Sequence, residues 1–342
     1  MFEKQIEIPS AEEILTELPL PKGLAEIKRE RDELCKAVIT GRSNLLLVIV
    51  GPCSAHDSKP VLEYVRRLGK LNEKVKDKLV LVPRIYTNKP RTKGVGYKGM
   101  FSQPDPENKE DILKGIRTIR NLHIQAIGES GLSAADEMLY PENYAYLEDL
   151  LTYIAVGARS SENQMHRLVS SGIELPVGFK NPMGGSIPVL LNSIYAAQSA
   201  QVFKYHNYQV ATCGNEYAHA VLRGKVDEYG NDIPNFHYET VMQVFEGYAN
   251  SGGELKNPAI IVDSNHSNSG KRYHQQIRIV EEILQNRLYD RGFKKIVKGF
   301  MIESFLEEGC QSRDEVFGKS ITDPCLGWAD TERLILDIAE KA

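Results

Sequence analysis

The feature that most constrains the fold is a regular alternation of short apolar runs with segments of helical character. Strands that alternate with helices of about 10 to 20 residues are typical of parallel βα units, which build α/β proteins. The candidate strands are the runs 45–50, 78–86, 131–139, 153–159, 176–181, 200–206, 259–266 and 296–304. About eight such units predict a (β/α)8 barrel, also called a TIM barrel.

The segments between the strands carry helix signals. Residues 58–75 and 271–290 repeat apolar side chains at the spacing of one helix face. Asp57 or Ser58 can cap the first of these helices, and Pro60 is tolerated in its opening turn. The pattern therefore predicts helices between the strands, as a barrel requires.

Two segments lie outside the barrel pattern. Residues 1–44 form a predicted N-terminal helical extension, and residues 207–236 form a long excursion after the predicted sixth strand. The sequence has no internal repeat and no low-complexity linker. We therefore expect one domain, with an extension over residues 1–44 and a catalytic barrel over residues 45–342.

Composition narrows the class of protein. The chain has 42 basic and 46 acidic residues, a net charge of -4 and 42% hydrophobic residues. A protein that binds nucleic acid or a membrane surface is usually more basic, so neither partner is expected. The N-terminus is charged where a signal peptide is apolar, and the five cysteines show no CxxC spacing. These features predict a cytoplasmic protein with free thiols.

The segment 83–99, PRIYTNKPRTKGVGYKG, is a basic loop that follows the second predicted strand. It contains Arg84, Lys89, Arg91, Lys93 and Lys98. Like charges this close repel one another unless an anion lies among them, because a bound phosphate or carboxylate forms charge-assisted hydrogen bonds. The loop therefore predicts an anion site, although a solvated basic surface loop remains the alternative.

In a TIM barrel the functional face is formed by the loops that follow the carboxyl ends of the strands. Reactive or charged residues follow nearly every predicted strand. In chain order they are Cys53, Arg84, Lys89, Glu137, Arg159, Lys180, Arg223 (in the excursion after strand six), His266, Glu303 and Asp323. Loops of random composition would not show this pattern often, so we expect these side chains to meet at one mouth.

Two groups with different chemistry stand out among these residues. The cationic group is Arg84, Lys89, Arg91, Arg159, Lys180 and Arg223. Arginine binds phosphate or carboxylate through paired donors, so this group is large enough for two phosphorylated small molecules. A buried lysine such as Lys180 could instead form an imine with a substrate carbonyl.

The second group, Cys53, His266, Glu303 and Asp323, consists of possible metal ligands. Sulfur, nitrogen and oxygen donors together suit a borderline divalent ion such as Mn, Fe, Co or Zn better than Ca or Mg. The four residues are scattered along the chain, so a buried thiol, a hydrogen-bonded histidine and two salt-bridge partners remain the alternative.

GVGYKG at 94–99 formally matches a dinucleotide fingerprint but does not open a helix, so no organic cofactor is expected.

Eight motifs in one order carry a resemblance to a known family. They are GPCSAHD (51–57), PRIYTNKPRT (83–92), GARSSENQMHR (157–167), PVGFKNP (176–182), LRG (222–224), VDSNHSNSGK (262–271), MIESFLEEG (301–309) and GKSITDPCLGW (318–328). Together they resemble the class I 3-deoxy-D-arabino-heptulosonate 7-phosphate (DAHP) synthases. The similarity covers the chain from about residue 45 to its end.

The resemblance implies a transferase that condenses phosphoenolpyruvate (PEP) with D-erythrose 4-phosphate, the first step of the shikimate pathway to aromatic amino acids. By position it implies the metal ligands Cys53, His266, Glu303 and Asp323. It implies contacts to PEP from Arg84, Lys89, Glu137, Arg159, Lys180, Arg223 and His266. It implies contacts to erythrose 4-phosphate from Lys89, Arg91, Thr92 and Asp323, and we assign catalytic roles to Lys89, Cys53 and His266.

The resemblance also implies a homodimer or homotetramer and a possible aromatic amino-acid effector. Glu174 stands where a small polar residue is expected beside the effector pocket, so the identity of the effector stays open. Two rival functions also stay open at this point. One is an imine-forming phosphosugar aldolase on the same barrel, and the other is a non-catalytic barrel that binds phosphorylated metabolites.

Overall fold

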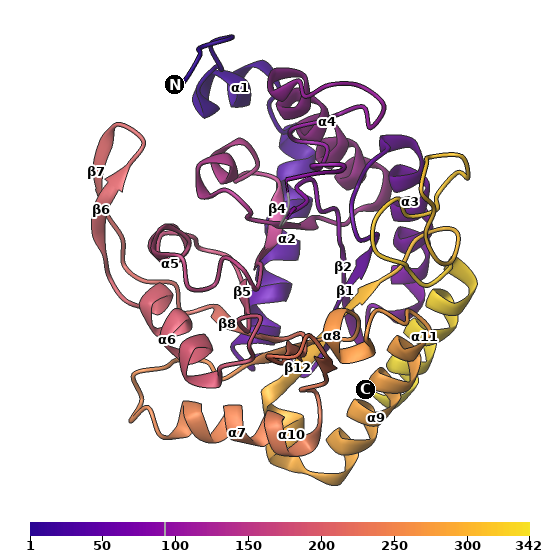
Figure 1. Cartoon of the computed structure of the whole chain (residues 1–342). Helices are drawn as coiled ribbons and strands as arrows, with labels where there is room; N and C mark the ends of the chain where they lie inside the picture. Colours follow the sequence, from indigo (N-terminus) through magenta and orange to yellow (C-terminus); the bar gives the residue numbers. More distant parts are fainter. Residues whose placement is uncertain (92–93) are drawn as a thin grey trace.

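The computed structural model describes residues 1–91 and 94–342, and within these residues eight parallel strands form a barrel surrounded by helices (Figure 1). The barrel strands are β1 (Leu46–Gly51), β2 (Leu79–Pro83), β3 (Ala134–Glu137), β4 (Leu151–Val156), β5 (Val177–Lys180), β8 (Ala218–Leu222), β11 (Ile260–Asp263) and β12 (Val297–Glu303). They pair in the order β2-β1-β12-β11-β8-β5-β4-β3. A parallel bridge between Arg84 and Ala135 joins the two ends of this sheet. The predicted (β/α)8 barrel is confirmed.

Helices separate the strands along the chain. They are α1 (Ala11–Glu17), α2 (Lys22–Ile39), α3 (Ser58–Val75), α4 (Ile112–Ser130), the short 3-10 helix η1 (Pro141–Tyr146), α5 (Gln164–Ser170), α6 (Ile187–Gln198), α7 (Tyr238–Ala249), α8 (His266–Ser269), α9 (Gln275–Tyr289), α10 (Arg291–Ile296) and α11 (Trp328–Lys341). Asp57 caps α3 by accepting a hydrogen bond from the Lys59 backbone N–H, as its position predicts. Among the described residues, no helix is long and apolar enough to span a bilayer.

The predicted sixth barrel strand, 200–206, is wrong. The strand β6 (Val202–Tyr205) lies in this segment, but it pairs antiparallel with β7 (Tyr208–Ala211) in a hairpin that projects from the barrel (Figure 1). The residues of β6 are exposed or half-buried, whereas every residue of β8 is buried. The sixth barrel strand is therefore β8, which lies inside the predicted excursion 207–236. A smaller hairpin, β9 (Lys225–Val226) and β10 (Asp232–Ile233), does follow this strand.

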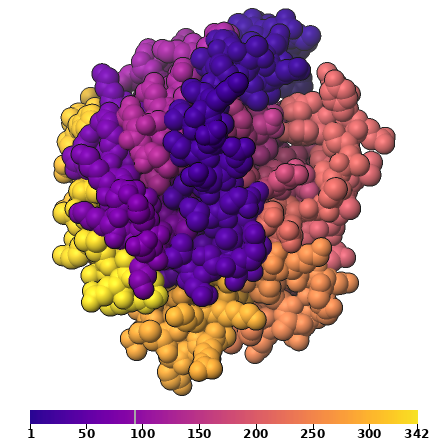
Figure 2. Space-filling model, turned by 180° about the vertical axis from the view of Figure 1, so that it is seen from behind, coloured from indigo at the N-terminus to yellow at the C-terminus, as the bar shows by residue number. Residues whose placement is uncertain are grey.

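The N-terminal extension is helical, as predicted, and packs against the barrel. Cys35, Val38 and Ile39 of α2 join the apolar cluster that fills the barrel interior, together with Leu47 of β1 and Tyr153 of β4. Figure 2 shows the indigo N-terminal segment crossing the back of the molecule. This packing supports our proposal that residues 1–44 are an extension of one domain with the barrel 45–342.

Candidate active site

The carboxyl ends of the barrel strands surround a pocket of about 290 Å³. Ten of the predicted site residues line it: Cys53, Arg84, Lys89, Arg91, Glu137, Arg159, Lys180, Arg223, His266 and Asp323. Glu303 is buried at the end of β12 and contacts residues of this pocket. Thr92 lies outside the described residues. The structure therefore brings the predicted cations and the predicted metal ligands to one mouth.

The cations of the pocket differ in whether a carboxylate lies close enough to compensate their charge. Arg223 follows β8 and only 5% of its surface is exposed, yet no carboxylate lies within 4.0 Å of its guanidinium in the part of the chain that the structure describes. Burial lowers the pKa of Arg223, although Asp263 opposes this effect. A buried cation without a partner is costly. Its position on the pocket wall favours an anionic ligand.

Asp263, at the end of β11, is a residue of the site that the sequence analysis did not single out. Its carboxylate lies 3.1 Å from the Lys180 ammonium and 2.8 Å from Nδ1 of His266. Burial alone raises the pKa of Asp263, but His266 and Lys180 outweigh it, so the pKa lies well below its usual range. One buried carboxylate thus orients both a substrate-binding candidate and a metal-binding candidate.

His266 has an unusual backbone conformation. Its φ is 49°, in the left-handed region that residues other than glycine rarely adopt and that costs about 1 to 3 kcal/mol. The strained turn places Nδ1 against Asp263, while Nε2 lies 3.8 Å from Oε1 of Glu303. The geometry therefore points one imidazole nitrogen toward a second ligand candidate and holds the other in place.

Glu303 is fixed by two neighbours deep in the site. Arg84 donates to Oε1 at 2.9 Å, and the Asn265 side-chain amide donates to Oε2 at 2.6 Å. The Arg84 guanidinium also stacks 3.7 Å from the centre of the Tyr86 ring. Arg84 is thus committed to a buried ion pair, and only part of its surface is free to contact a ligand.

Cys53, Glu303 and Asp323 each offer a ligand atom within 4.8 Å of the others. Burial and the Glu303 carboxylate raise the pKa of the Cys53 thiol, against the opposing effect of Lys89. Glu303 and Asp323 are two carboxylates in a small space, and they repel each other unless positive charge lies near them. Three of the four predicted donors therefore lie together and fit a divalent ion by their chemistry. His266, the fourth, is not in this group, and its Nε2 lies 3.8 Å from Oε1 of Glu303.

The ammonium of Lys89 lies beside two of these donors, 2.8 Å from Sγ of Cys53 and 3.2 Å from Oδ2 of Asp323. Burial alone lowers the pKa of Lys89. The nearby Cys53, Asp323 and Glu303 have the larger effect, so the pKa of Lys89 lies above its usual value. Lys271, which the sequence analysis did not single out, pairs with the other oxygen of Asp323 at 2.8 Å. Lys89 therefore reaches both the donor cluster and the pocket as a protonated amine.

Glu137 lies at the end of β3, the strand that the Arg84–Ala135 bridge joins to the end of β2. A Cβ atom at Gly157 would come within 2.3 Å of Oε1 of Glu137, so the carboxylate can occupy its place only because residue 157 has no side chain. Arg159, two residues farther along this loop, is exposed at the rim of the pocket. The loop after β4 thus accommodates an acid and presents a cation.

Comparison with known proteins agrees with this picture. The sequence matches the model of the DAHP synthetase I family over residues 23–335. It is 37% identical over 335 residues to the Phe-sensitive phospho-2-dehydro-3-deoxyheptonate aldolase of Escherichia coli (strain K12), covering 95% of this chain and 92% of the relative. It is 36% identical over 338 residues to the Trp-sensitive aldolase of Enterobacter agglomerans, covering 96% and 92%.

A solved structure shares the fold. The phospho-2-dehydro-3-deoxyheptonate aldolase from Francisella tularensis SCHU S4 superposes with a TM-score of 0.91 at 30% sequence identity, covering 100% of this chain and 98% of that chain. The family match covers nearly the whole sequence and confirms the resemblance that the eight motifs indicate. This chain belongs to the DAHP synthetase I family.

Proposed function

We propose that this enzyme condenses PEP with D-erythrose 4-phosphate and water to give DAHP and phosphate. In this reaction carbon 3 of PEP attacks the aldehyde carbon, and the new carbon–carbon bond leaves a developing positive charge at carbon 2. Water adds at carbon 2, and phosphate then leaves. Family membership supports the reaction. The structural observation that supports it best is the buried Arg223, which has no acidic partner among the described residues and faces the pocket.

The substrates are two anions that repel each other, so the first task of the pocket is to position them. We propose that Arg84, Lys89, Arg159, Lys180 and Arg223 hold PEP, assisted by Glu137 and His266. Fixing two reactants in a reactive geometry can lower the barrier by about 7 to 11 kcal/mol. The pocket of about 290 Å³ is small enough to keep such substrates in contact with one another.

We propose that erythrose 4-phosphate is held at the opposite end by Lys89, Arg91, Thr92 and Asp323. Arg91 donates from Nε to the backbone carbonyl of Tyr97, which leaves its terminal nitrogens to bind a phosphate. Lys89 is our proposed proton donor to the aldehyde oxygen, because its neighbours keep it protonated. It is the one residue that we assign to both substrates.

We further propose that Cys53, His266, Glu303 and Asp323 hold a divalent ion, with Mn, Fe, Co and Zn as the candidates. The mixed donor set and the mutual repulsion of its acidic members support this assignment. When bound, such an ion supplies Lewis-acid polarisation of the aldehyde oxygen. Asp263 then orients His266, and Arg84 orients Glu303.

The test is a phosphate-release assay with purified protein. Release from PEP should require erythrose 4-phosphate, should stop in EDTA and should return when a divalent ion is added. Protein that is loaded with metal but releases no phosphate from the two substrates would exclude the proposed reaction. It would also favour the second of the two rival functions, a barrel that binds phosphorylated metabolites without catalysis.

The imine-forming aldolase is less well supported by the site. Lys180 pairs with the buried carboxylate of Asp263 at 3.1 Å, so its nitrogen is engaged in an ion pair rather than free to attack a substrate carbonyl. Borohydride trapping of a substrate on Lys180, with full activity in EDTA, would favour the aldolase over our proposal.

Relatives named Phe-sensitive and Trp-sensitive support an aromatic amino-acid effector for this enzyme too. We propose that it binds in the pocket of about 560 Å³ between α5 and the β6–β7 hairpin, which Ser171, Glu174, Phe203 and Val210 help to line. Phe203 offers an aromatic wall, and Glu174 could pair with the amino group of the effector.

We also propose that the enzyme is a homodimer or homotetramer. Size-exclusion chromatography with light scattering would measure the number of chains in the assembly.

A further inference from the structure

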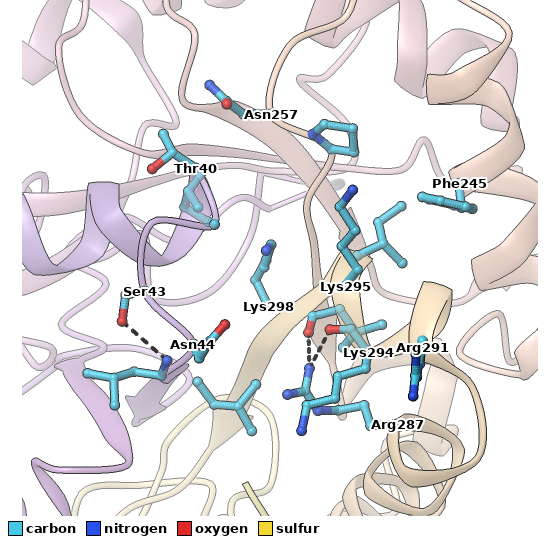
Figure 3. A pocket seen from close by; sticks show the side chains of 17 residues that line it. Thr40, Ser43, Asn44, Phe245, Asn257, Arg287, Arg291, Lys294, Lys295 and Lys298 are labelled. Carbon is cyan, nitrogen blue, oxygen red and sulfur yellow. Dashed lines mark hydrogen bonds between the residues drawn. The ribbon is translucent and has the colours of Figure 1, made fainter.

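A second strongly basic pocket lies at the opposite end of the barrel, where the strands begin. It has a volume of about 540 Å³ and is bounded by the loop between α2 and β1, by α10 and by the first residues of β12 (Figure 3). We call it the N-face pocket. Its lining includes five cations: Arg287, Arg291, Lys294, Lys295 and Lys298.

Among the described residues, none that lines the N-face pocket is acidic. Within residues 1–91 and 94–342, none of its five cations has a carboxylate within 4.0 Å. In contrast, many surface cations elsewhere on the chain are paired, such as Arg66 with Glu129 at 2.6 Å. The charge of the N-face pocket is therefore unbalanced, in a chain whose net charge is -4.

Two of the cations lie deep in the pocket. Arg287 is buried and uses Nη1 to donate to the backbone carbonyls of Lys294 and Val297, which fixes the end of α10 (Figure 3). Lys298, the second residue of β12, is half-buried, and burial together with Arg287 and Lys295 lowers its pKa. The structure thus keeps an ammonium beside a guanidinium at the floor of the pocket, where each destabilises the other.

The loop between α2 and β1 forms the facing wall. At Gly41, where φ is 74°, a Cβ atom would lie 3.3 Å from Nζ of Lys298, so the ammonium reaches the backbone of this loop. Thr40, Ser43 and Asn44 add neutral hydrogen-bonding groups there. This wall contributes donors without negative charge, which is what the oxygens of an anion require.

We propose that the N-face pocket binds a small molecule that carries two or more phosphate groups. A single phosphate leaves most of five positive charges uncompensated, whereas a diphosphate or triphosphate meets several of them at once through charge-assisted hydrogen bonds. The volume of about 540 Å³ is within the range of small-molecule sites and exceeds the needs of one phosphate. The partly buried ring of Phe245 gives one side of the pocket an apolar surface for the rest of the ligand.

The test is isothermal titration calorimetry of the full chain with inorganic tripolyphosphate. Lys298→Met keeps the length of the side chain and removes its charge, and Lys295→Gln changes an exposed residue of the same pocket. Lys70→Gln is the matched control, since Lys70 is exposed and lies outside the pocket. Arg159→Ala removes a cation from the active-site pocket. It therefore distinguishes tripolyphosphate binding in the active site from binding in the N-face pocket.

We expect tripolyphosphate binding that weakens at least about tenfold in Lys298→Met and falls in Lys295→Gln. Binding to the N-face pocket should be unchanged in Lys70→Gln and Arg159→Ala, and phosphate alone should bind more weakly. Equal binding by wild type and both pocket variants would overturn the proposal, as would binding that only Arg159→Ala abolishes. A polyglutamate peptide that binds where tripolyphosphate does not would also overturn it.

Discussion

Replacing Asp263 with asparagine tests whether one buried carboxylate holds two parts of the active site. The asparagine side chain would keep the shape and an oxygen that can accept from the Asn265 backbone N–H, which lies 3.1 Å from Oδ1 of the aspartate. It would remove the charge that faces the Lys180 ammonium at 3.1 Å and the His266 ring at 2.8 Å. The perturbation is therefore electrostatic and nearly isosteric.

The expected magnitude follows from burial. Asp263 and Lys180 have side-chain exposures of only 1% and 4%, so solvent screens their ion pair little. Removing one partner of a buried pair costs about 3 to 5 kcal/mol, because it leaves the other charge uncompensated. We expect Asp263→Asn to lower the free energy of unfolding by about 3 kcal/mol. Loss of a group that orients a ligand lowers metal affinity or activity by about 10- to 100-fold.

Guanidinium unfolding and the phosphate-release assay measure the two effects. Glu340→Gln is the control for stability, because Glu340 is exposed and makes no ion pair within the described residues. It should change the free energy of unfolding by less than about 0.5 kcal/mol. An Asp263→Asn protein within about 1 kcal/mol and about twofold of wild type would refute the role that we assign to this carboxylate.

Three further predictions concern other parts of the chain. Lys89→Met should abolish turnover yet leave affinity for a divalent ion equal or higher in a metal-binding titration, since the Lys89 ammonium competes for the same donors; weaker metal binding would contradict this reasoning. Arg91→Ala should raise the KM for erythrose 4-phosphate more than the KM for PEP, and the reverse order in steady-state kinetics would show that its loop is wrongly assigned. His219 is buried, and burial lowers its pKa to about 4, whereas an unfolded histidine titrates near 6.5. The unfolded chain then binds the additional proton, so the free energy of unfolding should fall by up to about 3 kcal/mol as pH drops from about 6.5 to 4. His219→Gln should lose this part of the slope in guanidinium unfolding at a series of pH values, and an equal slope in both proteins would argue against a neutral buried His219.

The sequence predicts most of the barrel because its signals are local. Apolar runs locate seven of the barrel strands, and the helix 58–75 matches α3 at both ends. The sixth strand is misplaced because β6 and β8 are both short and apolar in part, and only their burial distinguishes them. Burial depends on tertiary packing, which periodicity does not report.

The sequence predicts those site residues whose side chains have a distinctive chemistry. Thiol, imidazole and cationic side chains at the strand ends indicate most of the pocket, and the eight motifs add the roles that the family resemblance implies. Asp263 is missed because an aspartate at a strand end is common, and its importance comes from its contacts with Lys180 and His266, which only the structure shows. The five cations of the N-face pocket all lie within residues 287–298, but the pocket is missed because only the fold places the loop between α2 and β1 opposite them.

Titration with cobalt(II) measures whether Cys53 binds the ion, because a thiolate bound to cobalt gives a charge-transfer absorption in the near ultraviolet. We expect this absorption to rise to saturation at one ion per chain, in step with the return of phosphate release after EDTA treatment. It should be absent in Cys53→Ala. A protein that regains full activity with cobalt but never shows the thiolate absorption would contradict the assignment of Cys53, and with it the proposed metal centre.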